Sequence, residues 1–407
     1  MREPYRLGVY VDDVFRVVEG PEGCRVSSDR AFLLFACEVG SRFQSLVLFG
    51  RTVMAPAHAD YVLPAAVRLV RLPHYANLRR IREVARATLG TVKGFWRGLE
   101  QVDIVWVFGP HPFAFLMATL ASARGKHVVF GVRQDTRAYF RARLPSARWA
   151  PVLLCVDAMD GFTRLLSRRV KTTIVGRGLA HRYGNTKRLL PMTVSLVRAA
   201  DVRASLPGDP STGSRVRLLT VGRLEPEKNP LLLVEAMARL ERQRPGCFEL
   251  TWVGRGVLAR AVAERAVVLQ VNHRIEWRDY IPFGPDLLGL YRESDIFVHV
   301  SLTEGVPQVL VEAWASGTPI VATDVGGVRE ALHGGDAGLL VPAKDVDALV
   351  QAITRVANDV ELRRRLVVRG LELARQTTLD VEAERVARFI ADGFSARSDG
   401  YRRCSRL

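Results

Sequence analysis

Residues 294–327 read SDIFVHVSLTEGVPQVLVEAWASGTPIVATDVGG. The apolar run at Ile296–Val300 predicts a buried strand, the segment Gln308–Gly317 predicts a helix, and Ile320–Thr323 predicts a second strand. Short apolar strands joined by a helix are typical of a parallel sheet that helices cover on both faces. Glu304 follows the first strand, at the carboxyl edge where open α/β sheets bind ligands.

The same alternation continues on both sides of this segment and predicts two doubly wound α/β domains. In the first half, strands are expected at Leu7–Val11, Ser45–Phe49, Ile104–Phe108, His127–Val132, Pro151–Val156 and Thr172–Gly176. Ser27, Ser28 and Asp29 are expected to cap a helix that runs through Val39. In the second half, further strands are expected at Arg217–Gly222, Glu249–Gly254 and Arg274–Tyr280, and helices at Pro230–Gln243, Leu258–Gln270, Leu287–Glu293, Val346–Asn358, Val360–Gln376 and Val381–Ala391.

A segment rich in Pro, Gly and Ser, residues 204–214, predicts a linker between the two domains. The chain has 407 residues, more than the roughly 250–300 over which one core grows. We therefore expect an amino-terminal domain over residues 1–205 and a carboxyl-terminal domain over residues 206–407. The last helix, about residues 380–394, is expected to pack back on the amino-terminal domain.

The basic charge lies in the first half of the chain. Residues 1–200 hold 31 Lys and Arg against 14 Asp and Glu, whereas residues 201–407 hold 28 of each. The excess of 17 positive charges attracts phosphates on nucleic acid, on anionic lipid or on a small substrate.

The five cysteines are scattered and without metal-ligand spacing, and no signal peptide precedes the first strand, so a cytoplasmic protein is expected. The uncharged stretch Ile104–Ala123 is interrupted by a Gly-Pro-His-Pro turn and predicts a strand and a helix, not a membrane span.

Two cations follow the strand that ends at Gly222. Arg223 and Lys228 lie in the loop before a helix that Asn229 can cap, with Pro230 at its first position. Cations beside a helix amino terminus form an anion site without a metal. The alternative is a solvated Arg/Lys loop.

Two glutamates flank the next loop and the start of its helix. Glu304 lies in a Gly/Pro turn, and Glu312 lies in the early part of the helix. The backbone N–H groups of Gly305 and Val306 can bond phosphate or sugar oxygens, and the helix carboxylate can accept both hydroxyls of a ribose. The alternative makes Glu304 an N-cap-like residue and Glu312 a surface residue, and makes the following strand and Gly-Gly turn a plain α/β unit.

The ordered set of segments VGRLEPEKNP, SDIFVHVSLTEGVPQVLVEAWASGTPIVATDVGG and GLLVP, within about residues 216–341, resembles the donor-binding domain of glycosyltransferase family 4. Members of that family are retaining enzymes of the GT-B fold. The resemblance implies a nucleotide-sugar donor in a cleft between two Rossmann-like domains, with catalytic roles for Glu304, Arg223 and Lys228. The donor-binding residues that it implies are Gly222, Arg223, Lys228, Glu304, Gly305, Val306, Pro307 and Glu312.

In this resemblance Arg223 and Lys228 neutralise the donor diphosphate, Glu304 contacts the donor sugar, and Glu312 binds the ribose. No cofactor or metal is implied, since two cations can stabilise the leaving group. Asp345-Val346-Asp347 spells the DxD signature of metal-dependent glycosyltransferases, but it precedes a helix, where we expect Asp345 to act as a cap. Gly254-Arg255-Gly256 is expected to form a turn after a strand.

The acceptor half departs from the family pattern. The segment after the first strand holds Asp12 and Asp13 and no glycine-rich loop, and Arg133 and Asp135 lie near the place where many members carry a histidine. His111, in the Gly-Pro-His-Pro turn, can also face the cleft. The alternatives are an ordinary turn for the aspartates, a salt-bridged loop for Arg133 and Asp135, and a structural role for His111.

The acceptor is expected to be a glycan, a lipid-linked molecule or a small molecule. The basic segments Leu78–Arg97 and Thr136–Trp149 can lie on an anionic membrane, at its inner face, or pack on their own sheet with a solvated basic face. Two other functions stay open. One is a basic nucleic-acid-binding protein, although no known nucleic-acid motif is present and no nucleic-acid partner is expected. The other is a non-catalytic module that binds a sugar nucleotide.

Overall fold

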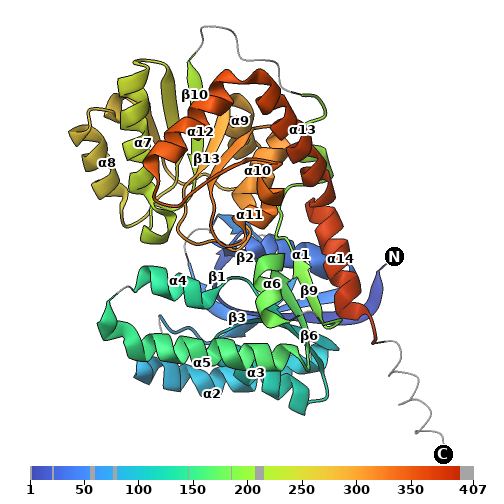
Figure 1. Cartoon of the computed structure of the whole chain (residues 1–407). Helices are drawn as coiled ribbons and strands as arrows, with labels where there is room; N and C mark the ends of the chain where they lie inside the picture. The colour runs from blue at the N-terminus through green and yellow to red at the C-terminus, as the bar shows by residue number, and fades with distance from the viewer. Residues whose placement is uncertain are drawn as a thin grey trace, which may run out of the picture.

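A computed structural model describes residues 2–20, 23–55, 60–76, 80–144, 146–184, 186–206 and 215–394. These residues form two α/β units, each built on one sheet (Figure 1). The boundary expected at residues 205/206 falls beside residues 207–214, which lie outside the described residues, as does Cys404.

The first sheet is built around one long strand. Its strands are β1 (Glu3–Gly20), β2 (Gly23–Ser28), β3 (Phe43–Met54), β4 (Tyr61–Val62), β5 (Arg68–Leu72), β6 (Ile104–Gly109), β7 (His127–Val132), β8 (Lys171–Val175) and β9 (Leu189–Met192). Strand β1 pairs with β3 along one side, and on its other side with β6 and then with β2. The β1–β2 and β2–β4 pairs are antiparallel and the other pairs are parallel, so the expected parallel sheet carries an antiparallel extension.

Helices cover both faces of this sheet. They are α1 (Phe32–Ser41), α2 (Ile81–Gly98), α3 (Pro112–Ala123), α4 (Thr136–Arg143), α5 (Ala150–Ser167) and α6 (Arg177–Tyr183). Residues of α1 join one buried cluster, and residues of α2, α3 and α6 join another. From the sequence, the hydrophobic residues of α2 could face either a membrane or the sheet. Some of them belong to the core, since Phe95 is fully buried.

Three local predictions in this half are wrong. Asp12 and Asp13 do not follow the first strand or form a turn, because they lie within β1, where its pairing with β3 is irregular between Tyr10 and Val14. Ser27 and Ser28 end strand β2, and helix α1 begins only at Phe32 without a side-chain cap. The run Pro151–Val156, expected as a strand, belongs to helix α5, with Pro151 in its first turn. A continuous apolar run does not distinguish a buried strand from a helix by periodicity, and proline is favoured at a helix start.

The second sheet is entirely parallel, in the order β12-β11-β10-β13-β14-β15. Its strands are β10 (Val216–Val221), β11 (Phe248–Val253), β12 (Ile275–Arg278), β13 (Ile296–His299), β14 (Ile320–Thr323) and β15 (Leu339–Val341). Its helices are α7 (Pro230–Gln243), α8 (Ala259–Val268), α9 (Pro285–Glu293), α10 (Gln308–Ser316), α11 (Val328–Ala331), α12 (Val346–Asn358) and α13 (Val360–Gln376).

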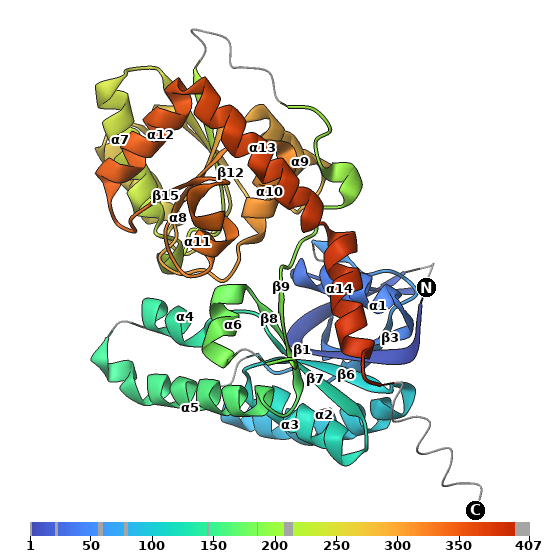
Figure 2. The same ribbon diagram turned by 45° about the vertical axis from the view of Figure 1, so that its right-hand side comes forward.

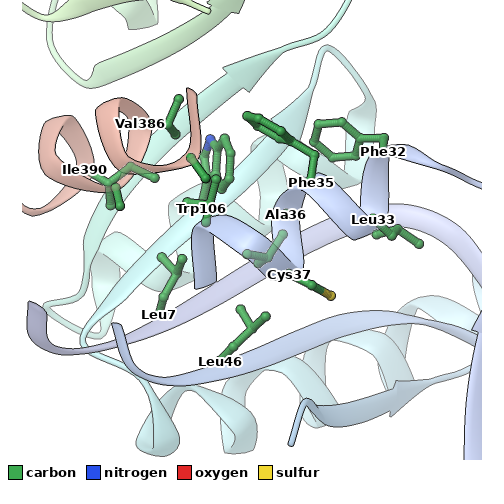
Figure 3. Packing of buried hydrophobic residues seen from close by; sticks show 14 of the residues in the cluster. Leu7, Phe32, Leu33, Phe35, Ala36, Cys37, Leu46, Trp106, Val386 and Ile390 are labelled. Atoms are coloured by element: carbon green, nitrogen blue, oxygen red, sulfur yellow. The ribbon is translucent and has the colours of Figure 1, made fainter. Parts of the chain in front are cut away.

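The last helix, α14 (Leu379–Ala391), leaves the second unit and packs on the first (Figure 2). Val386 and Ile390 of α14 lie beside Trp106 of β6 and close to α1 (Figure 3). The carboxylate of Glu382 accepts a hydrogen bond from the backbone N–H of Thr193, at 3.1 Å. Helix α14 thus completes one face of the first core and ties the two units together.

Candidate active site

Two loops meet at the carboxyl edge of the second sheet because strands β10 and β13 are parallel neighbours. The first loop runs from Gly222 through a 3₁₀ turn at Pro226–Lys228, and the second joins β13 to α10. The backbone N–H of Leu302 donates to the carbonyl of Glu227 at 2.8 Å, and the Lys228 ammonium forms an ion pair with the Glu304 carboxylate. Two residues that the sequence assigned to separate roles are therefore in contact.

Glu304 lies in a small polar network at the end of β13. Its Oε1 atom accepts from the Ser301 hydroxyl at 2.7 Å and lies 3.2 Å from Nε2 of His299. Burial on its own raises the pKa of Glu304, but the Lys228 charge and His299 outweigh it, so the pKa falls well below its usual range. Glu304 is therefore an ionised carboxylate at neutral pH.

The second cation, Arg223, also has a carboxylate partner. Its guanidinium lies 3.1 Å from Oε1 of the buried Glu227, yet its side chain is 53% exposed toward the loop surface. A hollow of about 20 Å³ lies beneath Arg223 and Lys228, between β10 and β13. Each expected phosphate-binding cation is thus held in place by a glutamate.

Two glycine turns support these loops at close range. A Cβ at Gly326 would overlap the carbonyl oxygen of Glu304, and one at Gly327 would overlap that of Gly305. Likewise, a Cβ at Gly254 would overlap the carbonyl oxygen of Gly222. The Gly-Gly turn, which one alternative took as a plain structural unit, therefore determines where the Glu304 loop lies.

Helix α10 starts after Pro307 and buries Glu312, so the alternative of a surface glutamate is wrong. The hydroxyl of Tyr291 donates to Oε2 of Glu312 at 2.9 Å. Burial raises the pKa of Glu312 to about 7, against the opposing effect of that hydrogen bond. This carboxyl therefore changes its protonation state close to neutral pH.

The cap expected from Asn229 does not form. Asn229 precedes Pro230 at the start of α7, as predicted, but it has a left-handed backbone and its side chain accepts no capping hydrogen bond. By contrast, the Asp345 carboxylate accepts from the backbone N–H of Ala348 at 2.9 Å and caps α12 as expected. Among the described residues, no group of three or more His, Cys, Asp and Glu side chains is arranged to hold a metal.

The second loop faces the ends of strands β7 and β8 in the first unit. A Cβ at Gly305 would lie 3.7 Å from the carbonyl oxygen of Arg133, and one at Gly176 would lie 2.9 Å from the Val306 side chain. A second bridge joins the two units, where the hydroxyls of Tyr61 and Tyr280 lie 2.8 Å apart. The donor-side loops therefore lie opposite the acceptor-side candidates.

One acceptor-side cluster is centred on Asp12. Its carboxylate lies 3.1 Å from Nε of Arg51 and 3.2 Å from Nε2 of His111, and it accepts from the Tyr75 hydroxyl at 2.8 Å. Burial lowers the pKa of His111 despite the neighbouring carboxylate. The sequence did not single out Arg51 as a site residue, although its place just after the predicted strand Ser45–Phe49 could have indicated it.

A second cluster holds Asp13 and Arg133. The Asp13 carboxylate lies 3.5 Å from both Arg133 and Arg30, and the Arg133 guanidinium lies 4.9 Å from the Phe32 ring centre. Asp135 is separate from this cluster. It caps α4 through the backbone N–H of Ala138, at 3.0 Å, and forms an ion pair with Arg182, which gives it a structural task.

Residues 215–359 match the family described as glycosyl transferases group 1. The chain carries a glycosyl transferases group 1 domain. The match contains all the residues expected on the donor side, from Gly222 to Glu312, together with the Gly-Gly turn beside them. The resemblance stated from the sequence is therefore confirmed for this domain.

Curated relatives of two kinds resemble the chain over different lengths. A D-inositol 3-phosphate glycosyltransferase of Corynebacterium efficiens is 30% identical over 227 residues, or 52% of this chain and 53% of that protein. The chain spans about half the length of the D-inositol 3-phosphate glycosyltransferases that it matches. A phosphatidyl-myo-inositol mannosyltransferase of Mycolicibacterium smegmatis is 27% identical over 351 residues, or 83% of this chain and 84% of that protein.

Solved structures share the whole fold. WaaG, a glycosyltransferase involved in lipopolysaccharide biosynthesis, superimposes with a TM-score of 0.68 over 95% of this chain and 100% of that chain, at 16% identity. A sucrose-phosphate synthase from Thermosynechococcus elongatus gives 0.68 over 96% and 100%, at 19% identity. The two units thus form the expected GT-B fold, with the group 1 domain as its second half.

Proposed function

We propose that this chain is a metal-independent retaining glycosyltransferase that moves a sugar from a nucleotide diphosphate sugar to a hydroxyl acceptor. The observation that carries the proposal is the contact of Lys228 with Glu304 inside the group 1 domain, beside Arg223 and opposite the first unit. A non-catalytic binding module is disfavoured because Arg223, Lys228, Glu304 and Glu312 are all present together.

The chemistry of the leaving group supports two cations at this edge. Breaking the anomeric C–O bond places negative charge on the nucleoside diphosphate, and Arg223 and Lys228 can stabilise it. One preorganised electrostatic group of this kind lowers a barrier by about 3–4 kcal/mol. The two glutamate partners keep both cations oriented before the donor arrives. We propose that they serve in place of a divalent metal ion.

Glu304 supplies the complementary charge for the sugar. Its Lys228, Ser301 and His299 contacts all go to Oε1, so the proposal assigns Oε2 to a hydroxyl of the donor sugar. Because its pKa is low, Glu304 is a poor proton donor and a good stabiliser of an oxocarbenium-like sugar. Retention would then follow from same-face attack assisted by the leaving phosphate.

On the acceptor side the proposal rests on two clusters of residues and does not single out one base. The clusters of Asp12 with His111 and of Asp13 with Arg133 are the groups we propose to position the acceptor hydroxyl. Relatives named for inositol phosphate and for phosphatidyl-myo-inositol make a phosphorylated polyol or its lipid the first acceptors to try. Glycans and small molecules follow. A cytoplasmic site of action and contact with the inner membrane face are part of this proposal.

A screen of UDP- and GDP-sugars by thermal shift, followed by product analysis, tests the proposal. UDP-sugars come first on family prevalence, and mannose is included because two relatives are named mannosyltransferases. We expect one donor to raise the melting temperature, a product of retained anomeric configuration, and a rate that EDTA does not change. Loss of the rate on chelation would overturn the metal-independent mechanism. Stabilisation without turnover would indicate a module that only binds a sugar nucleotide. Salt-sensitive retention on nucleic acid would favour a nucleic-acid-binding protein.

A further inference from the structure

Helix α5 exposes apolar side chains and buries polar ones, which is the reverse of the usual pattern for a helix on a water-facing surface. Every residue of α5 that is exposed is apolar or glycine: Ala150, Pro151, Val152, Leu154, Cys155, Ala158, Gly161, Phe162 and Leu165. Leu154, Phe162 and Leu165 are 71%, 50% and 49% exposed. Helices of soluble proteins normally turn such residues to the core and their charged residues to water.

The charged residues of α5 point the other way. Asp160 is buried, accepts from the Tyr183 hydroxyl at 3.0 Å and pairs with Arg164 of the same helix. Asp157 is engaged by Arg137 of α4 at 2.8 Å. The polar side of α5 therefore holds the helix to the first unit, and its apolar side is left for a partner.

Helix α2 adds cations to the same end of the molecule. Both views place α2, α3 and α5 together on the side of the first unit that faces away from the second unit (Figures 1 and 2). Phe115 of α3 packs edge-on against Phe162 of α5, with ring centres 4.9 Å apart. On α2, Leu89 and Trp96 are 79% and 38% exposed. The exposed cations of α2 are Arg82, Arg86, Lys93 and Arg97.

Cations also lie at both ends of the apolar stripe. Arg148 is exposed just before α5, with its guanidinium over the Trp149 ring, and Arg168 and Arg169 are exposed just after it. From Leu154 to Leu165 the stripe extends about 16 Å along the helix axis. A helix with a wide apolar side and flanking cations is suited to lie in the plane of an anionic interface.

We propose that the outer face of α5, with the basic outer face of α2, docks this protein on a bilayer surface that contains anionic lipid. The apolar side chains enter the headgroup boundary, and the Arg and Lys side chains meet the lipid phosphates. Charge argues against a second copy as the partner, because two faces drawn from a half with 17 excess positive charges repel each other. No helix of the described residues is long and apolar enough to cross a membrane, so the contact is with the surface.

The docking specifies the membrane contact named in the proposed function, and its test does not depend on sugar transfer. It keeps the cations of α2 and Arg148, which lie in the two segments expected from the sequence, but its apolar surface is that of α5. That expectation used the side of α2 on which Phe95 lies, and the structure buries this residue. It also used the Thr136–Trp149 segment, where Arg137 and Arg141 of α4 are engaged by Asp157 of α5.

Sedimentation with vesicles of phosphatidylcholine containing phosphatidylglycerol tests the proposal on the full chain. The wild type is expected to sediment with these vesicles and to be released by salt. The double substitution Leu154→Glu with Leu165→Glu should weaken binding by about tenfold or more. Val268→Glu, at a residue of α8 that is 68% exposed, is the matched control and should bind like the wild type.

Two more measurements complete the test. Melting curves establish that the variants fold, and Arg86→Gln with Lys93→Gln should weaken binding to anionic vesicles without altering the α5 stripe. The proposal is overturned if the wild type ignores anionic vesicles or if the α5 variant binds unchanged. It is equally overturned if light scattering shows a wild-type dimer that the α5 variant dissociates, since the face would then be an interface between copies.

Discussion

The Lys228 ammonium and the Glu304 carboxylate form an ion pair that joins the loops after β10 and β13. The two residues are 76 positions apart. The Glu304 carboxylate also accepts from the Ser301 hydroxyl, and the backbone N–H of Lys228 donates to the Glu225 carbonyl at 2.9 Å. An ion pair this deep in the structure makes the partners interdependent, because removal of one leaves the other as an uncompensated charge. In the proposed mechanism, donor-phosphate binding and donor-sugar binding would therefore be coupled through this contact.

Replacing Lys228 by Ala is expected to lower turnover by about a hundredfold or more, because the leaving diphosphate loses a stabilising charge. Glu304→Gln should lower turnover to a similar degree, and the double variant should lose less than the sum of the two, as expected for residues in contact. Steady-state rates of the four proteins measure this coupling. Arg239→Ala removes an exposed cation that pairs with Asp347 and should leave the rate unchanged. Near-normal turnover of either single variant would rule out the assigned roles.

Nucleotide binding should tighten as the pH rises through about 7. Burial raises the pKa of Glu312 to about 7, so below that pH the carboxyl is protonated and accepts ribose hydroxyls poorly. Affinity for the nucleotide, measured by calorimetry at several pH values, should rise and then level off. Tyr291→Phe removes the hydrogen bond that lowers this pKa, so its profile should shift to higher pH. A profile that is unchanged in Glu312→Gln would contradict the assignment.

The raised pKa of Glu312 also predicts how the stability of the fold depends on pH. A carboxyl whose pKa is higher in the folded than in the unfolded state binds more protons when folded, so its contribution to stability falls as the pH rises from about 4.5 to about 7. Glu312→Gln should therefore raise the melting temperature relative to the wild type at pH values above 7, and the gain should vanish in acid. An equal shift at all pH values would show that Glu312 is not the titrating group.

Most of the second half could be predicted from the sequence. Helices α7, α12 and α13 begin and end where the apolar spacing indicated, because proline or aspartate marks each start. The run Pro151–Val156 was mistaken for a strand because the apolar residues of helix α5 face outward. The buried positions of α5 have helical spacing but are mostly polar, namely Val156, Asp160, Thr163 and Ser167. The contacts of Lys228 with Glu304 and of Glu312 with Tyr291 join distant segments, and only the fold brings these partners together.

Gly326→Ala should weaken both the fold and the activity. Gly326 has a φ of +50°, and a Cβ there would overlap the Glu304 carbonyl oxygen, so the loop that carries Glu304 must move. Gly334→Ala is the matched control, since its φ of +73° is also left-handed but no atom lies within 4 Å of the added Cβ. In each variant the left-handed backbone of the new alanine should lower the free energy of unfolding by about 1–2 kcal/mol. Only Gly326→Ala should also lose turnover. Equal turnover in the two variants would show that the Gly-Gly turn does not position Glu304.

Arg133→Ala should separate the acceptor side from the donor side. Arg133 is held by Asp13 and by the Phe32 ring, and its backbone lies against Gly305, so it belongs to the first unit but faces the donor loop. Loss of its charge is expected to raise the acceptor KM severalfold, while nucleotide affinity measured by calorimetry stays close to the wild-type value. Arg124→Ala, which removes a cation near Trp96 on the outer side, should change neither constant. If Arg133→Ala weakened nucleotide binding as strongly as acceptor binding, Arg133 would belong to the donor site, and the acceptor hydroxyl would have to be positioned by the Asp12 cluster alone.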